Sequence, residues 1–396
     1  MKATALDSDA ARQPEAGGYS FFGLCAMLFV VCSAFSSQMV MPMWVGAMIT
    51  DYQLSETAAG AIASAELFTV AVMSVIGALI VNRMDRRLMA LVGILILIVG
   101  NGLSIVMHDV VFLTGLRMLC GIGKGFTVAA VFSTIAQAPN PTRAFALTNA
   151  AYAALGAFYF LLIPNQIKAL GASGAFLVIT IVTAVGLLLL PWMPRVKVQA
   201  APVMDDLRTM LTPAGLVALA GLAGVMLGHS IIWIFIQMIG TSEGLTLDQV
   251  GIVLSLSMLV TIAGPATAHV LPSSLGLWRP MAWALGIKAV LAILLVANLG
   301  AAVYWISAPA FSVISLFVVP FVMGLLSKID TSGRLAASGS AAMTLGGSVG
   351  SLLGGWTAET LGYGALGWMA ALIFAVSAMF LLPQAFRSDQ TVATGC

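Results

Sequence analysis

Ionisable side chains are rare in this sequence, yet five of them lie inside long apolar stretches: Glu66, Arg117, Lys124, His229 and Lys288. A charge in an apolar layer costs about 2.5–3.5 kcal/mol on membrane-insertion scales, so such residues are candidates for function. One carboxylate, one imidazole and three cations are suited to ion pairing and proton exchange. The sequence shows neither a nucleophile with its base nor paired catalytic carboxylates, so we expect no enzyme activity.

Glu66 has two candidate partners on another helix. Arg117 and Lys124 are seven residues apart, which puts them on one helix face two turns apart. Glu66 is expected at a depth between them, in a separate apolar segment. We hypothesise that Glu66 pairs with one of these cations and that protonation of Glu66 releases the pair. The alternative is a permanent structural ion pair.

His229 begins a stripe on one helix face, with Trp233 at i+4 and Gln237 at i+8. An imidazole here can act as a second proton site, and the alternative is a packing role among apolar residues. Lys288 lies in a later apolar segment. It is either functional, or pairs with a backbone carbonyl, or reaches toward the membrane interface.

These side chains must be positioned by membrane-spanning helices. Of the 396 residues, 60% are hydrophobic and 8% are charged, and the mean hydropathy is +1.05, whereas soluble chains average roughly a quarter charged residues. Since a spanning helix needs about 20 mostly apolar residues, we predict an all-α membrane protein with twelve transmembrane helices. The predicted spans are 20–48, 56–82, 88–107, 110–137, 143–165, 172–192, 213–240, 247–271, 279–301, 303–326, 333–358 and 364–385.

The basic residues predict the orientation of these spans. Thirteen of the 17 lysines and arginines fall on the side of the amino terminus, and only Lys168 falls in a loop on the other side. Basic loops face the cytoplasm, so both termini are expected to be cytoplasmic. The longest polar interruption lies at the midpoint. We expect a cytoplasmic tail (1–19), an N-terminal six-helix bundle (20–193), a cytoplasmic linker (194–212), a C-terminal six-helix bundle (213–385) and a second tail (386–396).

The two predicted bundles share a faint internal repeat. Segments 54–64 and 245–255 match at leucine, glycine and serine positions with a constant offset of 191 residues (54 to 245, 60 to 251 and 64 to 255). An offset near half the chain indicates duplicated six-helix units, which are found in many secondary transporters.

Two short motifs add a resemblance to a known family. A glycine precedes a turn rich in Arg and Asp between the second and third spans, and Arg117 is followed by closely spaced glycines (121, 123 and 125) in the fourth. With its twelve predicted spans, the chain resembles the major facilitator superfamily over its whole length. The resemblance implies a conformational role for the first motif, although the position of the family's acid holds an amide. Its residues are Gly77, Asn82, Arg83, Asp85, Arg86 and Arg87.

The resemblance also implies alternating access, in which two bundles rock about a central cavity. In this family the first, fourth, seventh and tenth spans line that cavity, so the stripe of His229 is expected to face the solute. Helix stripes supply further candidates. The expected cavity residues are Gln38, Asn149, Tyr152, Trp233 and Gln237.

The function expected from these features is secondary transport. The glycines around Lys124 lack the spacing of a nucleotide-binding loop, so the driving force is expected to be a gradient, most simply of protons. Interior cations outnumber Glu66, which favours a small organic anion as the solute. The alternatives are proton-coupled efflux of drugs or sugars and a membrane receptor that binds without translocation.

We expect the partners to be a small solute, protons and the lipid bilayer. The four cysteines show no CxxC or CxxH spacing, so we predict no disulfide, metal or other cofactor. A basic run typical of nucleic-acid binding is absent from the sequence, and we expect neither nucleic acid nor nucleotide as a partner. Compact loops and the family resemblance indicate a multi-pass protein of the bacterial inner membrane, with a monomer favoured.

Overall fold

The computed structural model describes residues 20–81, 83–194, 212–272, 275–330 and 334–394. Within these residues all regular structure is helical. The predicted tail 1–19, residues 195–211 of the predicted linker, and Asn82 of the first motif lie outside the described residues.

The helices follow the order of the predicted spans. The N-terminal half contains α1 (Phe21–Ala34), α2 (Ser36–Met39), α3 (Met41–Asp51), α4 (Glu56–Ile80), α5 (Arg86–Leu103), α6 (Val110–Ile135), α7 (Pro141–Leu170), α8 (Ala172–Leu189) and the 3₁₀ helix η1 (Leu190–Trp192). The C-terminal half contains α9 (Pro213–Trp233), α10 (Ile236–Ser242), α11 (Leu247–Val260), α12 (Ala263–Val270), α13 (Trp278–Leu295), α14 (Ala301–Ile329), α15 (Arg334–Leu361) and α16 (Tyr363–Thr394).

Ten helical segments of the described residues are long and apolar enough to cross a membrane. The two remaining predicted spans are the first, which is divided into α1, α2 and α3, and the eleventh, α15, which is rich in glycine and serine. In the structure, α1 to α3 precede α4, and α15 connects α14 to α16. The all-helical architecture with twelve crossings therefore agrees with the sequence prediction.

The first span is irregular near its middle. Helices α1, α2 and α3 are separated at Phe35 and Val40, and Pro42 lies in the first turn of α3. Proline has no backbone N–H and clashes with the preceding turn of a continuous helix. The carbonyl of Ser37 instead accepts a hydrogen bond from Trp44 Nε1 (2.8 Å). Ser37 and its neighbour Gln38 therefore lie at a break in the helix rather than along a regular face.

Two predicted helix ends differ from the structure by more than five residues. The sequence predicts a ninth span that reaches residue 301, but α13 ends at Leu295, because Asn298 (φ 53°) and Gly300 (φ 90°) have left-handed backbones that end the helix. Conversely, α16 continues past the predicted span to Thr394. Asp389 anchors this extension by accepting hydrogen bonds from the backbone N–H groups at the start of α13.

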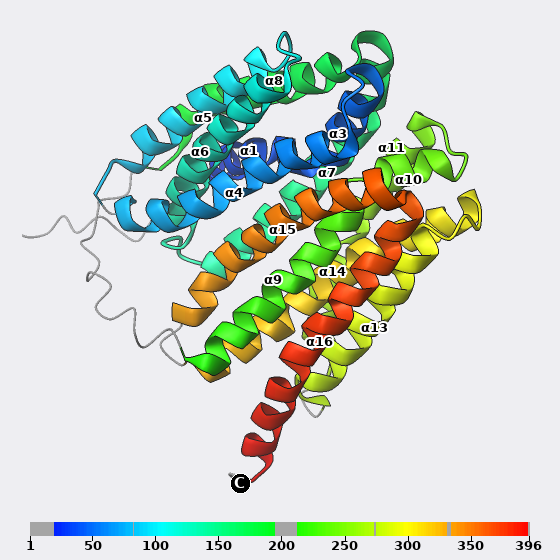
Figure 1. The fold of residues 1–396 in the computed structure, drawn as a ribbon. Helices are drawn as coiled ribbons and strands as arrows, with labels where there is room; N and C mark the ends of the chain where they lie inside the picture. Colours follow the sequence, from blue (N-terminus) through cyan, green and yellow to red (C-terminus); the bar gives the residue numbers. More distant parts are fainter. Residues whose placement is uncertain (1–19, 82, 195–211, 273–274, 331–333, 395–396) are drawn as a thin grey trace, which may run out of the picture.

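The helices pack as two groups that meet along a long interface (Figure 1). In the first group, α6 packs on α4 and α5, and α8 on α5 and α1; in the second, α9 packs on α15 and α16, and α13 on α14 and α16. The groups meet where α4 packs on α15, α7 on α11 and α3 on α10. The second and eleventh spans, and the fifth and eighth, thus form the two main contacts between halves.

The sequence repeat coincides with these contacts. Ser55 and Thr246, which are related by the same offset, are the N-caps of α4 and α11, where their side chains accept backbone hydrogen bonds. The matched glycines, Gly60 and Gly251, lie against backbone carbonyls of the opposite half, at Ser351 and Phe160 respectively. A Cβ at either position would overlap those oxygens. Glycine is therefore required where the halves approach most closely.

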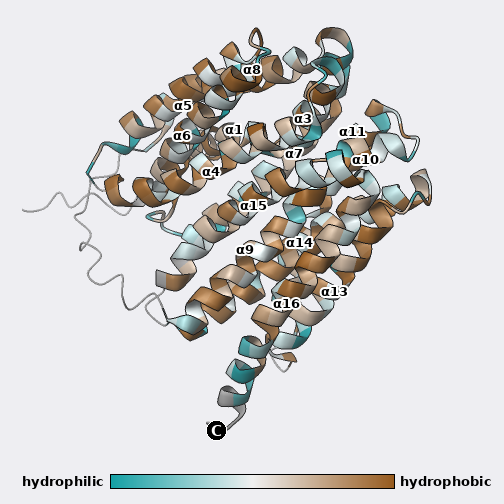
Figure 2. Cartoon of the chain, viewed as in Figure 1, coloured by the Kyte–Doolittle hydropathy of each residue, from teal (hydrophilic) through white to brown (hydrophobic). Residues whose placement is uncertain are grey.

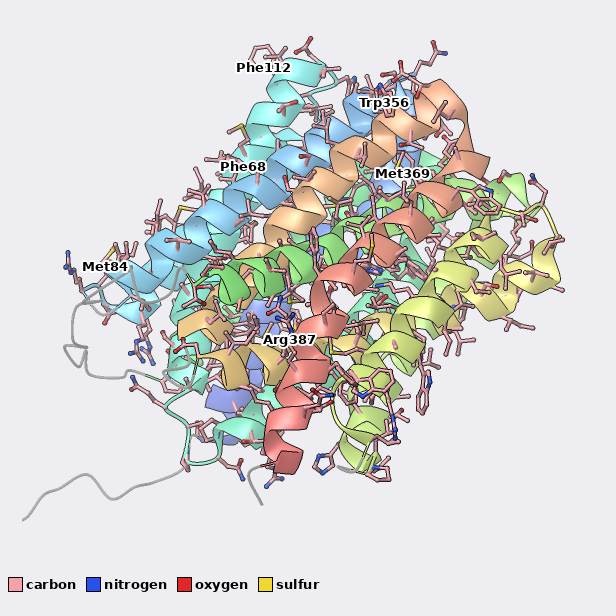
Figure 3. The ribbon with its side chains drawn as sticks, turned by 60° about the horizontal axis from the view of Figure 1, so that its bottom comes forward. Phe68, Met84, Phe112, Trp356, Met369 and Arg387 are labelled. Atoms are coloured by element: carbon pink, nitrogen blue, oxygen red, sulfur yellow. The ribbon has the colours of Figure 1, made fainter. Side chains whose placement is uncertain are left out.

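Apolar residues cover the outside of both groups. Figure 2 shows hydrophobic residues along most of the helix length, with hydrophilic ones gathered toward the loops and the end of α16. Large side chains such as Phe68, Phe112 and Trp356 point outward, and half or more of the Phe68 and Phe112 surfaces is exposed (Figure 3). Such a surface is unfavourable in water and suited to hydrocarbon.

Candidate functional site

The N-terminal half contains a fully buried ion pair. Glu66 in α4 accepts hydrogen bonds through Oε1 from Lys124 Nζ in α6 (2.7 Å) and from the hydroxyl of Ser37. Its Oε2 lies 3.6 Å from Arg117 Nη1. The side chains of Glu66, Lys124 and Arg117 have no exposed surface. Glu66 therefore contacts both of its candidate partners, and Lys124 more closely than Arg117.

Arg117 has further partners inside the same half. Its guanidinium donates to Asn101 Oδ1 (2.9 Å), to Ser104 Oγ (2.7 Å) and to the carbonyl of Gly100 (3.2 Å), all in α5 or at its end. The ring of Phe176 lies 4.9 Å from the guanidinium carbon. Both terminal nitrogens of the guanidinium are thus bonded while Nε has no partner among the described residues, which fits a positioning role that ties α6 to α5.

The ion pair has one polar link to the centre of the molecule. Lys124 Nζ donates to Gln38 Oε1 at 3.3 Å. Gln38 lies at the break in the first span and is partly exposed. Because Gln38 also lines the central cavity described next, a change at Glu66 can be transmitted to the cavity through Lys124 and one amide.

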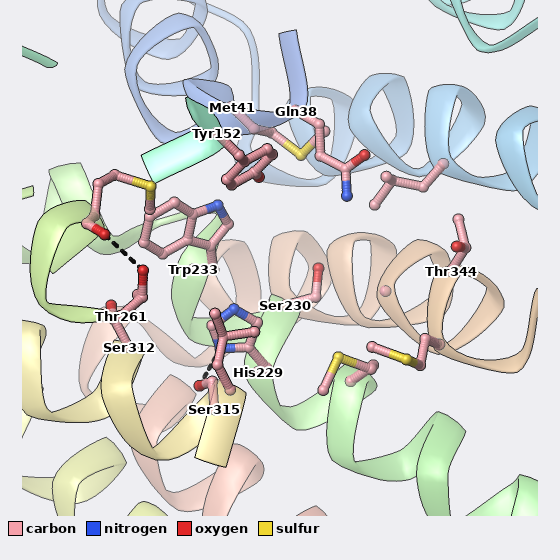
Figure 4. Close-up of a pocket in the computed structure, with 16 residues that line it drawn as sticks. Gln38, Met41, Tyr152, His229, Ser230, Trp233, Thr261, Ser312, Ser315 and Thr344 are labelled. Atoms are coloured by element: carbon pink, nitrogen blue, oxygen red, sulfur yellow. Dashed lines mark hydrogen bonds between the residues drawn. The ribbon is translucent and has the colours of Figure 1, made fainter. Parts of the chain in front are cut away.

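A cavity of about 240 Å³ lies between the two halves (Figure 4). The N-terminal half contributes Gln38, Met41, Leu67 and Tyr152. The C-terminal half contributes Met226, His229, Ser230, Trp233, Met258, Thr261, Ser312, Ser315, Leu316, Met343, Thr344 and Gly347. The wall combines four methionines and two large aromatics with hydroxyls and one amide. Among its described lining residues, His229 is the one imidazole.

His229 is held by aromatic stacking. Its ring stacks on Trp233 (centroids 5.9 Å apart) and on Phe311 of α14 (5.3 Å), and its Nδ1 is 3.1 Å from the hydroxyl of Ser315. Trp233 and Tyr152 face the cavity from opposite halves (Figure 4). Of the expected cavity residues, Gln38, Tyr152 and Trp233 are therefore brought together, and His229 joins them.

Two expected cavity residues lie elsewhere. Helix α9 ends at Trp233, and α10 begins at Ile236, so Gln237 does not continue the stripe of His229. Gln237 is instead buried against Gly46, where α10 packs on α3. Asn149 is exposed on α7 and is not among the described lining residues. The stripe prediction assumes a continuous helix, and the interruption after Trp233 rotates Gln237 out of it.

The residues of the first motif make contacts within the N-terminal half. Asp85 caps α5 by accepting from the N–H of Leu88 (2.9 Å), and Arg86 donates to the carbonyl of Ser133 at the end of α6 (3.1 Å). Arg87 donates to the carbonyl of Met193. Gly77 packs against α6, and Arg83 is exposed between α4 and α5. The described part of the motif thus joins α5 to its neighbours.

The halves are bonded to each other at one end. Lys168 in α7 forms an exposed ion pair with Asp248 in α11. Tyr363 donates to Glu56 (3.0 Å), and Glu359 accepts from the N–H of Thr57 (3.0 Å). Each of these residues lies near the end of its helix, and in each case this is the end far from the turn between α4 and α5. The two halves are therefore bonded to each other at the end that carries the α7–α8 connection.

Several site residues were not predicted. Ser37, Asn101 and Ser104 complete the buried hydrogen-bond network around Glu66 and Arg117. The methionines form much of the wall of the cavity. Asn101 and Ser104 are three residues apart in an otherwise apolar span, a spacing that could have indicated a polar helix face. The methionines carry no such signal, because their spacing does not distinguish a cavity from the core.

Comparisons with known proteins agree with this architecture. The family model of the Major Facilitator Superfamily matches residues 26–332. A mutant of the nucleoside transporter NupG superposes with a TM-score of 0.76 at 11% identity, covering 92% of this chain and 99% of that one. A proton-dependent oligopeptide transporter gives 0.71 at 14% identity (93% and 99%), and a D-xylose–proton symporter gives 0.68 at 16% identity (91% and 95%). A comparison with curated protein sequences gave no match.

At these identities the structural likenesses bear on the fold, while the family model covers well over half of the chain. The chain belongs to the Major Facilitator Superfamily and is a multi-pass membrane transporter of small solutes.

Proposed function

We propose that the protein is a proton-coupled secondary transporter that carries a small, uncharged, amphipathic organic solute by alternating access. The observation that carries the proposal is the cavity between the halves, with methionine and aromatic surface beside hydroxyls and an amide. Ligand sites of this kind are mostly apolar, with a few polar groups that fix orientation. The volume of about 240 Å³ suits a single aromatic or sugar-sized solute.

The cavity favours an uncharged solute over an organic anion. The anion prediction relied on Arg117 and Lys124 as interior cations. Both are fully buried and bonded to Glu66 or its neighbours, outside the cavity wall. An anion entering this cavity would meet neutral side chains and His229. The alternative of a neutral sugar-like or drug-like solute is therefore the better supported one.

We propose that Glu66 is the coupling residue in the N-terminal half. A proton on Glu66 removes the charge that holds Lys124, and Lys124 then has Gln38 as its remaining polar partner. Because Gln38 lines the cavity, a bound solute and the Lys124 side chain released by protonation of Glu66 would compete for the same amide. The nearby titratable and charged groups, Arg117 and Lys124, both favour the ionised carboxylate, so protonation needs the pair to separate.

We propose that the bonded end of the halves faces away from the cytoplasm. The α7–α8 connection at this end carries Lys168, whereas most other basic residues fall on the opposite side. The structure then corresponds to a cytoplasm-facing state. Cysteine labelling of Arg83→Cys and Lys168→Cys from opposite faces of the membrane tests the orientation, and labelling of both from one face would contradict it.

Solute uptake into proteoliposomes tests the substrate class. Phenyl glucoside and phenyl glucuronide differ by a neutral and a charged substituent, and we expect the neutral glycoside to accumulate under an imposed pH gradient. Trp233→Ala should abolish accumulation, because it removes the largest aromatic surface of the cavity. Trp368→Ala is the matched control, since Trp368 is 65% exposed on the outside of α16. Accumulation of the glucuronide alone would favour the organic anion instead.

A double variant tests the coupling residue. Glu66→Gln combined with Lys124→Gln replaces the ion pair by two neutral amides, while Arg117 keeps its hydrogen bonds to Asn101, Ser104 and Gly100. We expect solute exchange to continue and gradient-driven accumulation to stop. Neutralising the partly exposed Lys328–Asp389 pair is the control. Accumulation with the wild-type pH dependence in the Glu66 variant would show that Glu66 does not couple.

A further inference from the structure

The C-terminal half contains a buried lysine that the proposed function does not use. Lys288 in α13 has no exposed surface, and its Nζ has no hydrogen-bond partner among the described residues. The amine lies 5.1 Å from the ring centre of Phe311 in α14 and 4.9 Å from that of Phe374 in α16. Its surroundings are therefore two phenyl faces rather than an anion.

The other described ionisable groups on the helices around α13 either have bonding partners of their own or lie near the ends of their helices. Tyr304 donates to the carbonyl of Ile236, Tyr363 donates to Glu56, and Lys328 pairs with Asp389. Together with Arg387 of α16, these groups lie toward the ends of their helices. His229 of α9 is the titratable group that shares an aromatic contact with Lys288, since both approach the ring of Phe311.

An ammonium ion in such surroundings is unfavourable. Removal of the ion from water has a large energetic cost, and no carboxylate of the described residues is bonded to Lys288 to offset it. Contact with phenyl faces recovers only part of that loss, and phenylalanine is a weaker cation–π partner than tryptophan. A group in this situation usually gives up its charge instead.

The amine is close to the cavity without lining it. Phe311 separates Lys288 from His229, and His229 and Trp233 form the next two rings toward the solute. A movement of α14 that displaces Phe311 or its neighbour Phe374 would let water from the cavity reach the amine. Because α13 packs on both α14 and α16, the conformation of the C-terminal half decides whether Lys288 is accessible.

We propose that Lys288 is a second proton-binding site, which is an uncharged amine in this conformation and takes a proton from the cavity when the C-terminal half rearranges. The proton comes from a hydronium ion or from protonated His229, and the donor keeps the electrons of the broken bond. The lone pair of the amine nitrogen forms the new N–H bond. The resulting ammonium needs water or an anion nearby, so protonation favours the rearranged state. This inference rests on the proposed proton-coupled transport.

The protonation state can be measured without transport. The sequence contains only six lysines, so labelling of lysine with ¹⁵N at Nζ gives few signals, and the one lost in Lys288→Met is that of Lys288. At about pH 8 an ordinary lysine is an ammonium. We expect the Lys288 signal of the reconstituted wild-type protein to be that of a neutral amine while the Lys328 signal is that of an ammonium. An ammonium signal for Lys288 at this pH would overturn the inference.

A transport experiment tests whether this site contributes to coupling. In Lys288→Met we expect pH-gradient-driven accumulation of solute to fall at least tenfold while solute counterflow, which needs no net proton movement, continues. Lys288→Gln serves as a second variant if the first fails to fold. Lys328→Met is the control, because that lysine is partly exposed and paired with Asp389. Wild-type accumulation in the Lys288 variants would overturn the role in coupling.

The two experiments separate this inference from the proposed function. If wild-type protein moves no solute but Lys288 is a neutral amine, the proposed function fails and the buried proton-binding site stands. If wild-type protein accumulates solute with protons but Lys288 is a permanent ammonium, the transport proposal stands and Lys288 is a structural residue.

Discussion

The two halves of the molecule bury basic side chains in opposite ways. In the N-terminal half, Lys124 and Arg117 surround the carboxylate of Glu66, and serine, asparagine and carbonyl groups take up most remaining donors. In the C-terminal half, Lys288 lies against two phenyl rings with no bonded acceptor among the described residues. The same kind of side chain is thus paired in one bundle and unpaired in the other.

With the two proton-binding sites proposed above, this contrast predicts that the halves respond differently to a proton. In the N-terminal network a proton arriving at Glu66 would neutralise the carboxylate that holds Lys124. At Lys288 a proton adds a charge that the present surroundings do not stabilise. In this proposal, protonation of Glu66 weakens an existing ion pair, whereas protonation of Lys288 creates an ammonium that needs a new partner. Both protonations would therefore favour leaving the conformation in which the two halves are bonded at the α7–α8 end.

The strongest test of the contrast compares two lysine-to-methionine variants. Lys124→Met removes a partner of a buried carboxylate, and breaking such a pair destabilises proteins by about 3–5 kcal/mol. Lys288→Met replaces an unpaired amine by an apolar side chain of similar size, for which we expect a change within about 1.5 kcal/mol in either direction. Thermal unfolding of the purified proteins measures both, and equal losses would show that Lys288 is paired as firmly as Lys124.

A smaller effect is expected from Arg117→Lys. The substitution keeps the positive charge near Glu66 but loses the planar fork that contacts Asn101 and Ser104. Charge-assisted hydrogen bonds are worth about 1.5–3 kcal/mol each, and we expect a loss of stability of this order. Arg279→Lys, at the start of α13, is a suitable control. Unchanged unfolding in Arg117→Lys would mean that charge alone, and not geometry, matters in the network.

The smallest expected effect is that of Ser315→Ala. It removes the hydroxyl next to His229 Nδ1, which contributes about 1 kcal/mol as a single hydrogen bond. Stacking against Trp233 and Phe311 should keep the ring in position. We expect nearly unchanged stability and a modest shift in the pH dependence of solute uptake. A complete loss of uptake would show that this hydroxyl, rather than the ring stack, holds His229 in place.

The sequence predicted the pairing candidates well and the cavity only in part. A charge in an apolar span stands out because hydrocarbon tolerates so few, and for this reason Glu66, Lys124 and Arg117 were recognisable. Gln237 was misplaced because a helical stripe is extrapolated from a continuous helix, and α9 ends at Trp233. The exposed Asn149 carried no signal that distinguishes a cavity face from a lipid face.

Hydrophobicity, basic residues and turn-forming residues by themselves determined the helical class, the number of crossings and their alternation, since each depends on local preference for lipid or water. The repeat that contains Gly60 and Gly251 also indicated two related halves, but only the packed helices place these glycines where the halves touch. Which cation is paired, and which is not, was likewise decided only in three dimensions. That outcome depends on which side chains of other helices reach each charge, and a spacing along one chain does not contain this information.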